Sequence, residues 1–321
     1  MLKTIFTRLH NGFMILYQAF VLIHEHKAFY WFASLLMFSY AAIIGVIGSC
    51  FLYLIKSTSW TERIQTTTHV AHGTTTYSSA YQGTMDPFVF MSFMSMLIIA
   101  LMAHALWSTL LEIAISFYSA AAMHHDYANL HIRKAIWRSL TTSWRVVCWV
   151  LLNMTVGFII GALRGHSNNK KNFSILDALR QMLGSLLSMA WSICTFLVPQ
   201  VIAFEGTGAI LSIKTSFEII KKTFGESLSA NFIFSAFYSA ISMLVVLIGF
   251  LLSRFIYYDA SGTMHVPLIV SIAFGALVCS AAFAIALVSV ARMIFKTSIY
   301  FYAKNNECVG FDASLITQSF R

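Results

Sequence analysis

Long apolar runs separated by short polar segments dominate the pattern of the chain. A helix needs about 20 residues to cross the roughly 30 Å of hydrocarbon in a bilayer. Six runs reach this length, over residues 28–55, 88–114, 144–163, 182–204, 228–257 and 267–291. None shows the alternation over about ten residues that is typical of a membrane barrel strand. The pattern therefore predicts an all-α fold, a polytopic transmembrane helical bundle with a six-span membrane domain over residues 28–302.

Between the fourth and fifth runs, the hydrophobic pattern changes from continuous to periodic. Gly206, directly after Glu205, is placed to end the fourth span as a helix C-cap. From there, large apolar residues recur at steps of three and four, which keeps them on one stripe of a helix. These residues are Ile210, Ile213, Phe217, Ile220 and Phe224. We expect an amphipathic elbow helix over residues 207–224 in the cytoplasmic interface, ended by Gly225 before the fifth span.

The same stripe occurs at the start of the chain, within residues 1–27. Its members are Phe6, Leu9, Phe13, Leu16 and Phe20, and a shift of 204 residues places them on the five positions above. A looser copy precedes the third span, over residues 130–143. The chain is therefore interpreted as three repeats, each an amphipathic interfacial helix followed by a transmembrane hairpin.

Composition supports the membrane class. Hydrophobic residues make up 58% of the chain and charged residues 10%, whereas a soluble domain has about 25% charged residues. The first apolar run is too long for the hydrophobic core of a signal peptide, so we expect it to remain as the first span.

The distribution of Lys and Arg predicts the orientation. With a cytoplasmic N-terminus, the cytoplasmic segments hold 14 of the 21 Lys and Arg residues. The exception is the loop over residues 164–180, which holds four of them on the outside. We keep this assignment because an inside loop would require a re-entrant third or fourth span. The chain is thus expected in the cell inner membrane as a multi-pass protein with cytoplasmic termini and a cytoplasmic tail over residues 303–321.

The net charge of +9 also bears on the partners. Basic residues at an inner leaflet rich in anionic lipids explain this charge. We therefore expect membrane lipids, anionic at the cytoplasmic face, as partners, and no nucleic acid.

A motif within residues 112–228 resembles a known family. It consists of Phe117-Tyr118-Ser119-Ala120-Ala121, the segment AWSICTFLVPQVIAFEG over residues 190–206, and Ser216, Lys222, Gly225 and Glu226. The motif resembles an uncharacterised bacterial family of six-span integral membrane proteins, a domain of unknown function. More distantly, it is similar to the membrane domain of some glycerophosphodiester phosphodiesterases. The family often has Asn at the position of Ser119, and the first hundred residues match poorly. The resemblance implies the architecture and brings no activity.

Polar residues are sparse at membrane depth, where they are candidate functional residues by default. The candidates are His104, Glu112, Asn153, Asn231, Arg292 and Lys296. His104, Ser108 and Glu112 step by four and share one helix face, the nearest approach to a proton path. Because Glu112, Arg292 and Lys296 all lie toward the cytoplasmic ends of their spans, we favour a buried ion pair that closes the bundle.

Two features concern helix packing. Pro199 removes one helical hydrogen bond, which predicts a kink near the cytoplasmic end of the fourth span. Small residues recur at every fourth position in several spans, among them Gly157 and Gly161, and such faces let helices approach closely. We favour packing within one bundle; a homo-oligomer or a membrane-protein partner is the alternative.

Catalytic chemistry finds little support. The histidine pairs lack the HExxH pattern and a cysteine partner set, so we expect no metal. There is no P-loop, dinucleotide fingerprint or nucleophile elbow. We expect no catalytic residue and no cofactor. The polar segment 56–87 alternates before Gly73 and predicts either a β-hairpin or an irregular loop.

These patterns leave more than one class of function open. A membrane scaffold or assembly factor is favoured, because buried charge is scarce. A transporter or lipid-handling membrane protein is the alternative, and a cavity lined by His104, Asn153 and Asn231 would support it.

Overall fold

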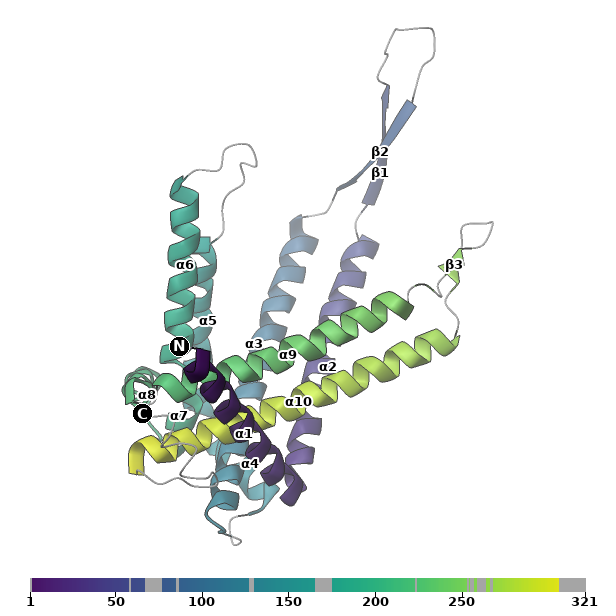
Figure 1. The fold of residues 1–321 in the computed structure, drawn as a ribbon. Coiled ribbons are helices and arrows are strands. Elements are labelled where there is room, and N and C mark those ends of the chain that lie inside the picture. Colours follow the sequence, from purple (N-terminus) through teal and green to yellow (C-terminus); the bar gives the residue numbers. More distant parts are fainter. Residues whose placement is uncertain are drawn as a thin grey trace. The chain divides into compact units, whose positions relative to one another are not determined.

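Helices make up most of the chain in the computed structural model (Figure 1). The structure describes residues 2–57, 59–66, 77–84, 87–126, 130–164, 175–222, 224–252, 254, 257–258, 264–265 and 268–305. The helices are α1 (Leu2–Glu25), α2 (Ala28–Ser57), α3 (Pro87–Met123), α4 (Ile132–Thr141), α5 (Ser143–Arg164), α6 (Ile175–Cys194), α7 (Val198–Glu205), α8 (Ala209–Lys222), α9 (Phe224–Leu252) and α10 (Leu268–Asn305). The strands are β1 (Ser59–Thr66), β2 (Tyr77–Thr84), β3 (Tyr257–Tyr258) and β4 (Met264–His265).

Six helical segments are long and apolar enough to cross a membrane, which confirms the predicted fold class. They are Ala28–Cys50, Pro87–Met123, Ser143–Arg164, Leu179–Glu205, Phe232–Leu252 and Ile269–Asn305. The second and sixth spans extend well past residues 114 and 291, where apolar composition had suggested that they end. Their last turns persist because neighbouring helices bury them: every residue of Ile113–Met123 is buried.

The order of the elements agrees with three repeats. The first runs α1, α2, α3; the second runs α4, α5 and α6 with α7; the third runs α8, α9, α10. In the first and third repeats, a pair of antiparallel strands connects the two long helices. Each repeat thus places one helix before a pair of spans.

The chain divides into two compact units, one formed by Met1–Phe38 with Leu106–Arg321 and the other by Ser39–Ala105. In the smaller unit, β1 and β2 pair in antiparallel register from Ser59 opposite Thr84 to Thr66 opposite Tyr77. Figure 1 shows this ribbon continuing beyond the ends of α2 and α3. The hairpin is therefore confirmed over these strands, while the expected turn at Gly73 lies outside the described residues.

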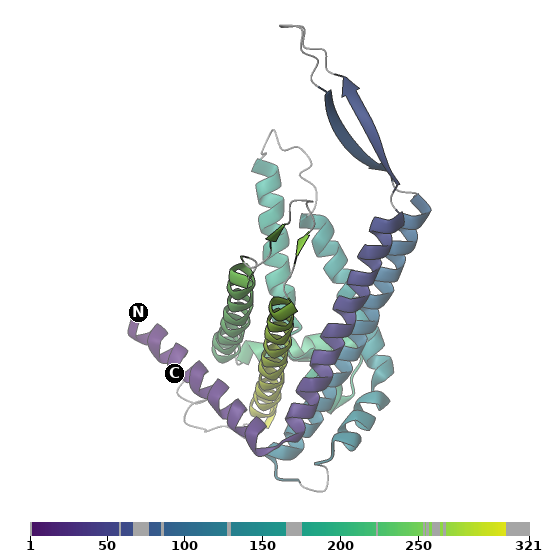
Figure 2. The ribbon, with the colours of Figure 1, turned by 90° about the vertical axis from the view of Figure 1, so that its right-hand side faces the viewer.

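In the larger unit, neighbouring helices pack in pairs. α9 runs beside α10 and α5 beside α6, as both views show (Figures 1 and 2). α1 contacts α9 and α10, and its Leu16, Ala19 and Ile23 are buried. These three residues follow a helical spacing, so one face of α1 packs on protein.

The fourth span is broken near Pro199. α6 ends at Cys194, residues 195–197 form a turn, and Pro199 lies in the first turn of α7, where its missing N–H is tolerated. The predicted kink is confirmed and is a full interruption of the helix.

The elbow helix forms as α8, with two corrections. It ends at Lys222, and Gly225 lies in the first turn of α9 instead of ending the elbow. Its protein-facing side consists of Ala209, Ser212, Ser216, Ile219 and Ile220. Of the expected apolar stripe, Ile210 and Phe217 are 76% and 49% exposed, as an interfacial helix requires, whereas Ile220 is buried against protein. Small and hydroxyl side chains allow close contact with protein, while the large apolar side chains remain available to lipid.

Candidate functional site

Three polar side chains from three different spans meet in the larger unit. Nζ of Lys296 on α10 lies 2.6 Å from Oε1 of Glu112 on α3, and both side chains are largely buried, at 12% and 15% exposed. Nε2 of Gln200 on α7 donates to the same Oε1 atom at 3.3 Å and to Oγ of Ser116 at 3.3 Å. This confirms the predicted ion pair and adds Gln200, which is fully buried. We call Glu112, Gln200 and Lys296 the polar triad.

The interruption of the fourth span contributes an aromatic ring to this site. Nζ of Lys296 lies 4.9 Å from the ring centroid of Phe196, and Cζ of Arg292 lies 5.7 Å from it. A ring at such distances attracts cations through its quadrupole. Arg292 therefore lies close to the ion pair and contacts the same ring as Lys296.

Each member of the polar triad comes from the last span of one repeat. An aromatic cluster has the same origin: Phe204 lies 5.6 Å from Phe117 and 5.0 Å from Phe301 between ring centroids. Edge-on and tilted rings at these distances are favourable aromatic pairs. The C-terminal parts of α3, α7 and α10 thus converge through one polar layer and one aromatic layer, which together form the candidate site.

The elbow helix α8 supports the turn between α6 and α7. The backbone N–H of Leu197 donates to Oγ of Ser216 at 3.1 Å, and both residues are fully buried. In an unbroken helix this N–H would donate to the carbonyl four residues earlier. Ser216 replaces that acceptor, so the break costs no buried hydrogen bond at this position.

Gly206 ends α7 as the sequence predicted. Its φ is 62°, in the left-handed region, and its N–H donates to the carbonyl of Ile202. A Cβ atom at this position would lie 3.2 Å from Nη1 of Arg145. Both the conformation and the neighbouring guanidinium group therefore favour glycine here.

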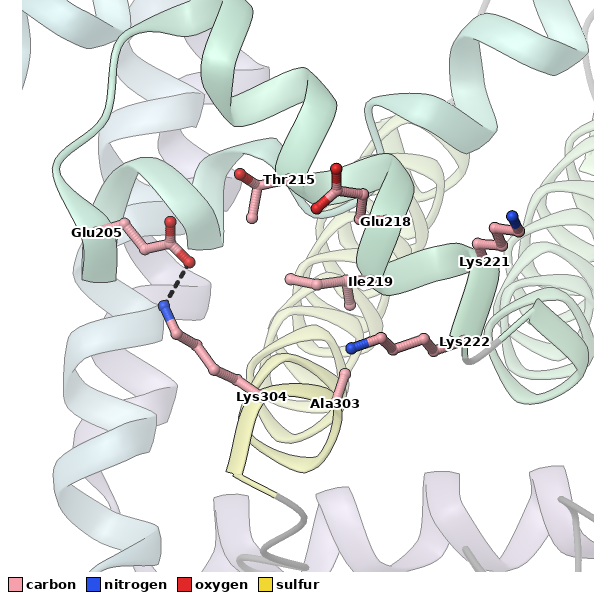
Figure 3. A pocket seen from close by; sticks show the side chains of 8 residues that line it. All are labelled: Glu205, Thr215, Glu218, Ile219, Lys221, Lys222, Ala303 and Lys304. Atoms are coloured by element: carbon pink, nitrogen blue, oxygen red, sulfur yellow. Dashed lines mark hydrogen bonds and ion pairs between the residues drawn. The ribbon is translucent and has the colours of Figure 1, made fainter.

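A second ion pair lies at the end of the same helix. Nζ of Lys304 lies 2.6 Å from Oε1 of Glu205, to which Tyr300 also donates its hydroxyl at 3.1 Å. The pair is more open than the first, because the Lys304 side chain is 49% exposed. Glu205 and Lys304 border an open cavity of about 710 Å³ next to α8 (Figure 3).

The other candidate residues do not join the polar triad by any described contact. His104 belongs to the smaller unit, where its ring lies 5.5 Å from that of Tyr40. Oδ1 of Asn153 accepts a hydrogen bond from Nε1 of Trp191 at 2.9 Å and so links α5 with α6. The side chain of Asn231 lies outside the described residues, although its backbone belongs to α9.

Metal chemistry finds no support in the described part of the chain, where no three His, Cys, Asp or Glu side chains come together as ligands. His124 instead lies 5.2 Å from the ring of Phe301, and His26 lies 6.5 Å from that of Tyr118. The pair His69 and His72 lies outside the described residues.

Sequence reasoning missed Gln200 as a partner of Glu112, and it missed the role of Ser216. The sequence did contain a signal for the aromatic contacts, because the dipeptide Phe117-Tyr118 recurs as Phe301-Tyr302 at the ends of the second and sixth spans. It marks equivalent positions of two repeats, where aromatic side chains meet.

Comparison with known proteins gives a family for this chain. No curated protein and no solved structure matches the chain. A family model described as "Family of unknown function (DUF6159)" matches residues 137–311, which is more than half of the 321 residues and includes Gln200 and Lys296. The chain therefore belongs to DUF6159, a family of unknown function.

Proposed function

We propose that this multi-pass membrane protein is a scaffold or assembly factor of the cell inner membrane, with cytoplasmic termini. The proposal rests on the contacts that the buried charged side chains make. Glu112 and Lys296 bind each other, and Gln200 donates to the same carboxylate oxygen, so the polar triad joins three spans. Charged groups that fasten helices together favour a structural role over a path for ions or protons.

Two cavities are described in the larger unit. The one of about 710 Å³ is bordered by α8 and the end of α10, and one of about 410 Å³ lies between His24 and Ser34. Neither is lined by His104 or Asn153, the residues that a transport cavity was expected to include. These two cavities therefore do not supply the feature expected of a transporter, and a lipid-handling role is the second candidate.

Small-residue faces offer the contact surface that a scaffold needs. A Cβ added at Gly157 or Gly161 on α5, or at Gly275 on α10, would meet no atom within 4 Å among the described residues. Gly184 on α6 differs, since its face is occupied by Arg164. A second copy or a helix of another membrane protein fits the open faces, because small residues let backbones approach closely in lipid.

Deletion of the gene, followed by quantification of the membrane proteome, tests this function. We expect one or a few membrane-protein assemblies to decrease and to recover when the chain is supplied again. A Gly157→Leu, Gly161→Leu variant should fold but fail to restore them, and Gly208→Leu, at an exposed loop position, serves as its control. Intact assemblies together with the accumulation of a small solute would contradict the scaffold and support transport.

A further inference from the structure

The cavity beside α8 contains charges of both signs. It is lined by Glu205, Thr215, Glu218, Ile219, Lys221, Lys222, Ala303 and Lys304. Its volume of about 710 Å³ falls within the range of about 300–1,000 Å³ that is usual for small-ligand sites. The cavity is therefore large enough for a polar group of the size of a lipid headgroup.

Two ammonium groups face this space from different helices. In Figure 3, the side chain of Lys222 on α8 points toward Ala303, that of Lys304 at the end of α10 extends toward Glu205, and Lys221 projects away. An ammonium group has three N–H donors, and Lys304 uses two of them, toward Glu205 and the Tyr300 hydroxyl. One donor of Lys304 and the ammonium group of Lys222 thus remain for an anionic oxygen.

A carboxylate of the same helix, that of Glu218, also lines the cavity. Glu218 precedes Lys222 by one helical turn, yet no ion pair joins these two described side chains. A wholly anionic ligand bound by Lys222 would be repelled by Glu218. A ligand with a phosphate at one end and an ammonium group at the other would satisfy both residues.

The position of the cavity favours a lipid as the source of such a group. Ile210 and Phe217 of α8 are exposed on a neighbouring face of the same helix. A helix with a large apolar face and lysines beside it lies at the level of the headgroups. The cavity then opens at the depth where phosphate groups are concentrated.

We propose that this cavity binds the headgroup of an amine-bearing phospholipid of the phosphatidylethanolamine class. The phosphate lies between Lys222 and Lys304, and the primary ammonium group lies against Glu218. This site goes beyond the scaffold function and does not depend on it, because binding is measured on the purified chain alone.

Binding of short-chain lipids to the purified full chain in detergent tests the site. The probes share their acyl chains and carry ethanolamine, choline or glycerol headgroups; water-soluble glycerophosphoethanolamine is the fourth. We expect the ethanolamine lipid to bind about ten-fold more tightly than either of the other two lipids, because only its headgroup offers Glu218 an N–H donor that also carries a positive charge. The choline headgroup has no N–H donor, and the glycerol headgroup has no positive charge. Lys222→Gln should weaken ethanolamine-lipid binding about ten-fold, and Glu218→Gln should abolish the preference among the three headgroups.

Lys214→Gln is the matched control, because Lys214 is an exposed lysine of the same helix that does not line the cavity. Equal losses in Lys214→Gln and Lys222→Gln would overturn the proposal in favour of general surface attraction. Equal binding of the glycerol and ethanolamine lipids by the unaltered chain would also overturn it. If glycerophosphoethanolamine binds as tightly as the lipid, the source is a soluble phosphodiester and the lipid assignment is wrong. Should Lys222→Gln fail to fold, the headgroup preference of Glu218→Gln decides the question.

Discussion

Gly206 combines a backbone requirement with a contact, and it gives a prediction at the scale of one residue. Its φ of 62° disfavours any residue with a Cβ atom, and that atom would lie 3.2 Å from Nη1 of Arg145. Gly206→Ala should therefore lower the free energy of unfolding by about 1–2 kcal/mol. Gly208→Ala, where a Cβ would meet no atom within 4 Å, should have a much smaller effect. Thermal unfolding of both variants in detergent measures the difference, and equal losses would contradict this explanation.

Single residues also show what sequence reasoning could and could not reach. Gly206 and Pro199 were predictable, because left-handed backbone and a missing N–H are properties of the residue itself. The pair Glu112–Lys296 was predictable from the scarcity of charge at membrane depth. The partners of Gln200 and Ser216 were not predicted, because they depend on which atoms of other helices these side chains approach, and hydrophobic periodicity does not encode such distances.

The elbow helix α8 shows the corresponding limit at the scale of an element. Its existence and the exposure of Ile210 and Phe217 followed from the steps of three and four, but the side that packs on protein did not. In lipid, the large apolar side chains of an amphipathic helix do not have to face protein, because lipid tails satisfy them equally well. The protein-facing side instead carries Ser212 and Ser216, with Ile219 beside them. Periodicity locates such a helix, while the side that packs on protein depends on the neighbouring helices.

The bond between Ser216 and Leu197 gives a prediction for how α8 supports the broken span. Ser216→Ala leaves the fully buried N–H of Leu197 without its acceptor, which costs about 1–3 kcal/mol of unfolding free energy. Thr215→Ala, which removes a neighbouring hydroxyl group that lines the cavity, should cost much less. Denaturant unfolding of the two variants compares the losses. A larger loss for Thr215→Ala would mean that α8 does not support the turn through Ser216.

For the whole molecule, the six spans together with the proposed cytoplasmic termini predict which segments face the cytoplasm. A reporter that is active only in the cytoplasm should be active when fused after Arg321 or inserted near Asn129, and inactive near His72. The loop over residues 164–180 is predicted to be outside despite its basic residues. α5 and α6 have 22 and 20 residues, about 33 and 30 Å at 1.5 Å per residue, so both are long enough to cross. Reporter activity near Asn168 or His72 would contradict the topology.

The convergence of three last spans is the central claim about the molecule as a whole. Glu112, Gln200 and Lys296 come from α3, α7 and α10, and Phe117, Phe204 and Phe301 form a second layer from the same helices. The three-repeat pattern in the sequence predicted equivalent helices. The contacts among those helices could not be predicted, because the repeats share few identical residues.

A double-mutant cycle on Glu112 and Lys296 tests this claim most directly. Glu112→Gln and Lys296→Met each leave one buried charge without its partner, so each should lower the free energy of unfolding by about 3–5 kcal/mol. The double variant removes both charges of the pair and should be no less stable than either single variant. Unfolding of the four proteins in the same detergent gives the coupling free energy. Single variants as stable as the unaltered chain, or losses that simply add in the double variant, would contradict a polar triad that closes the bundle.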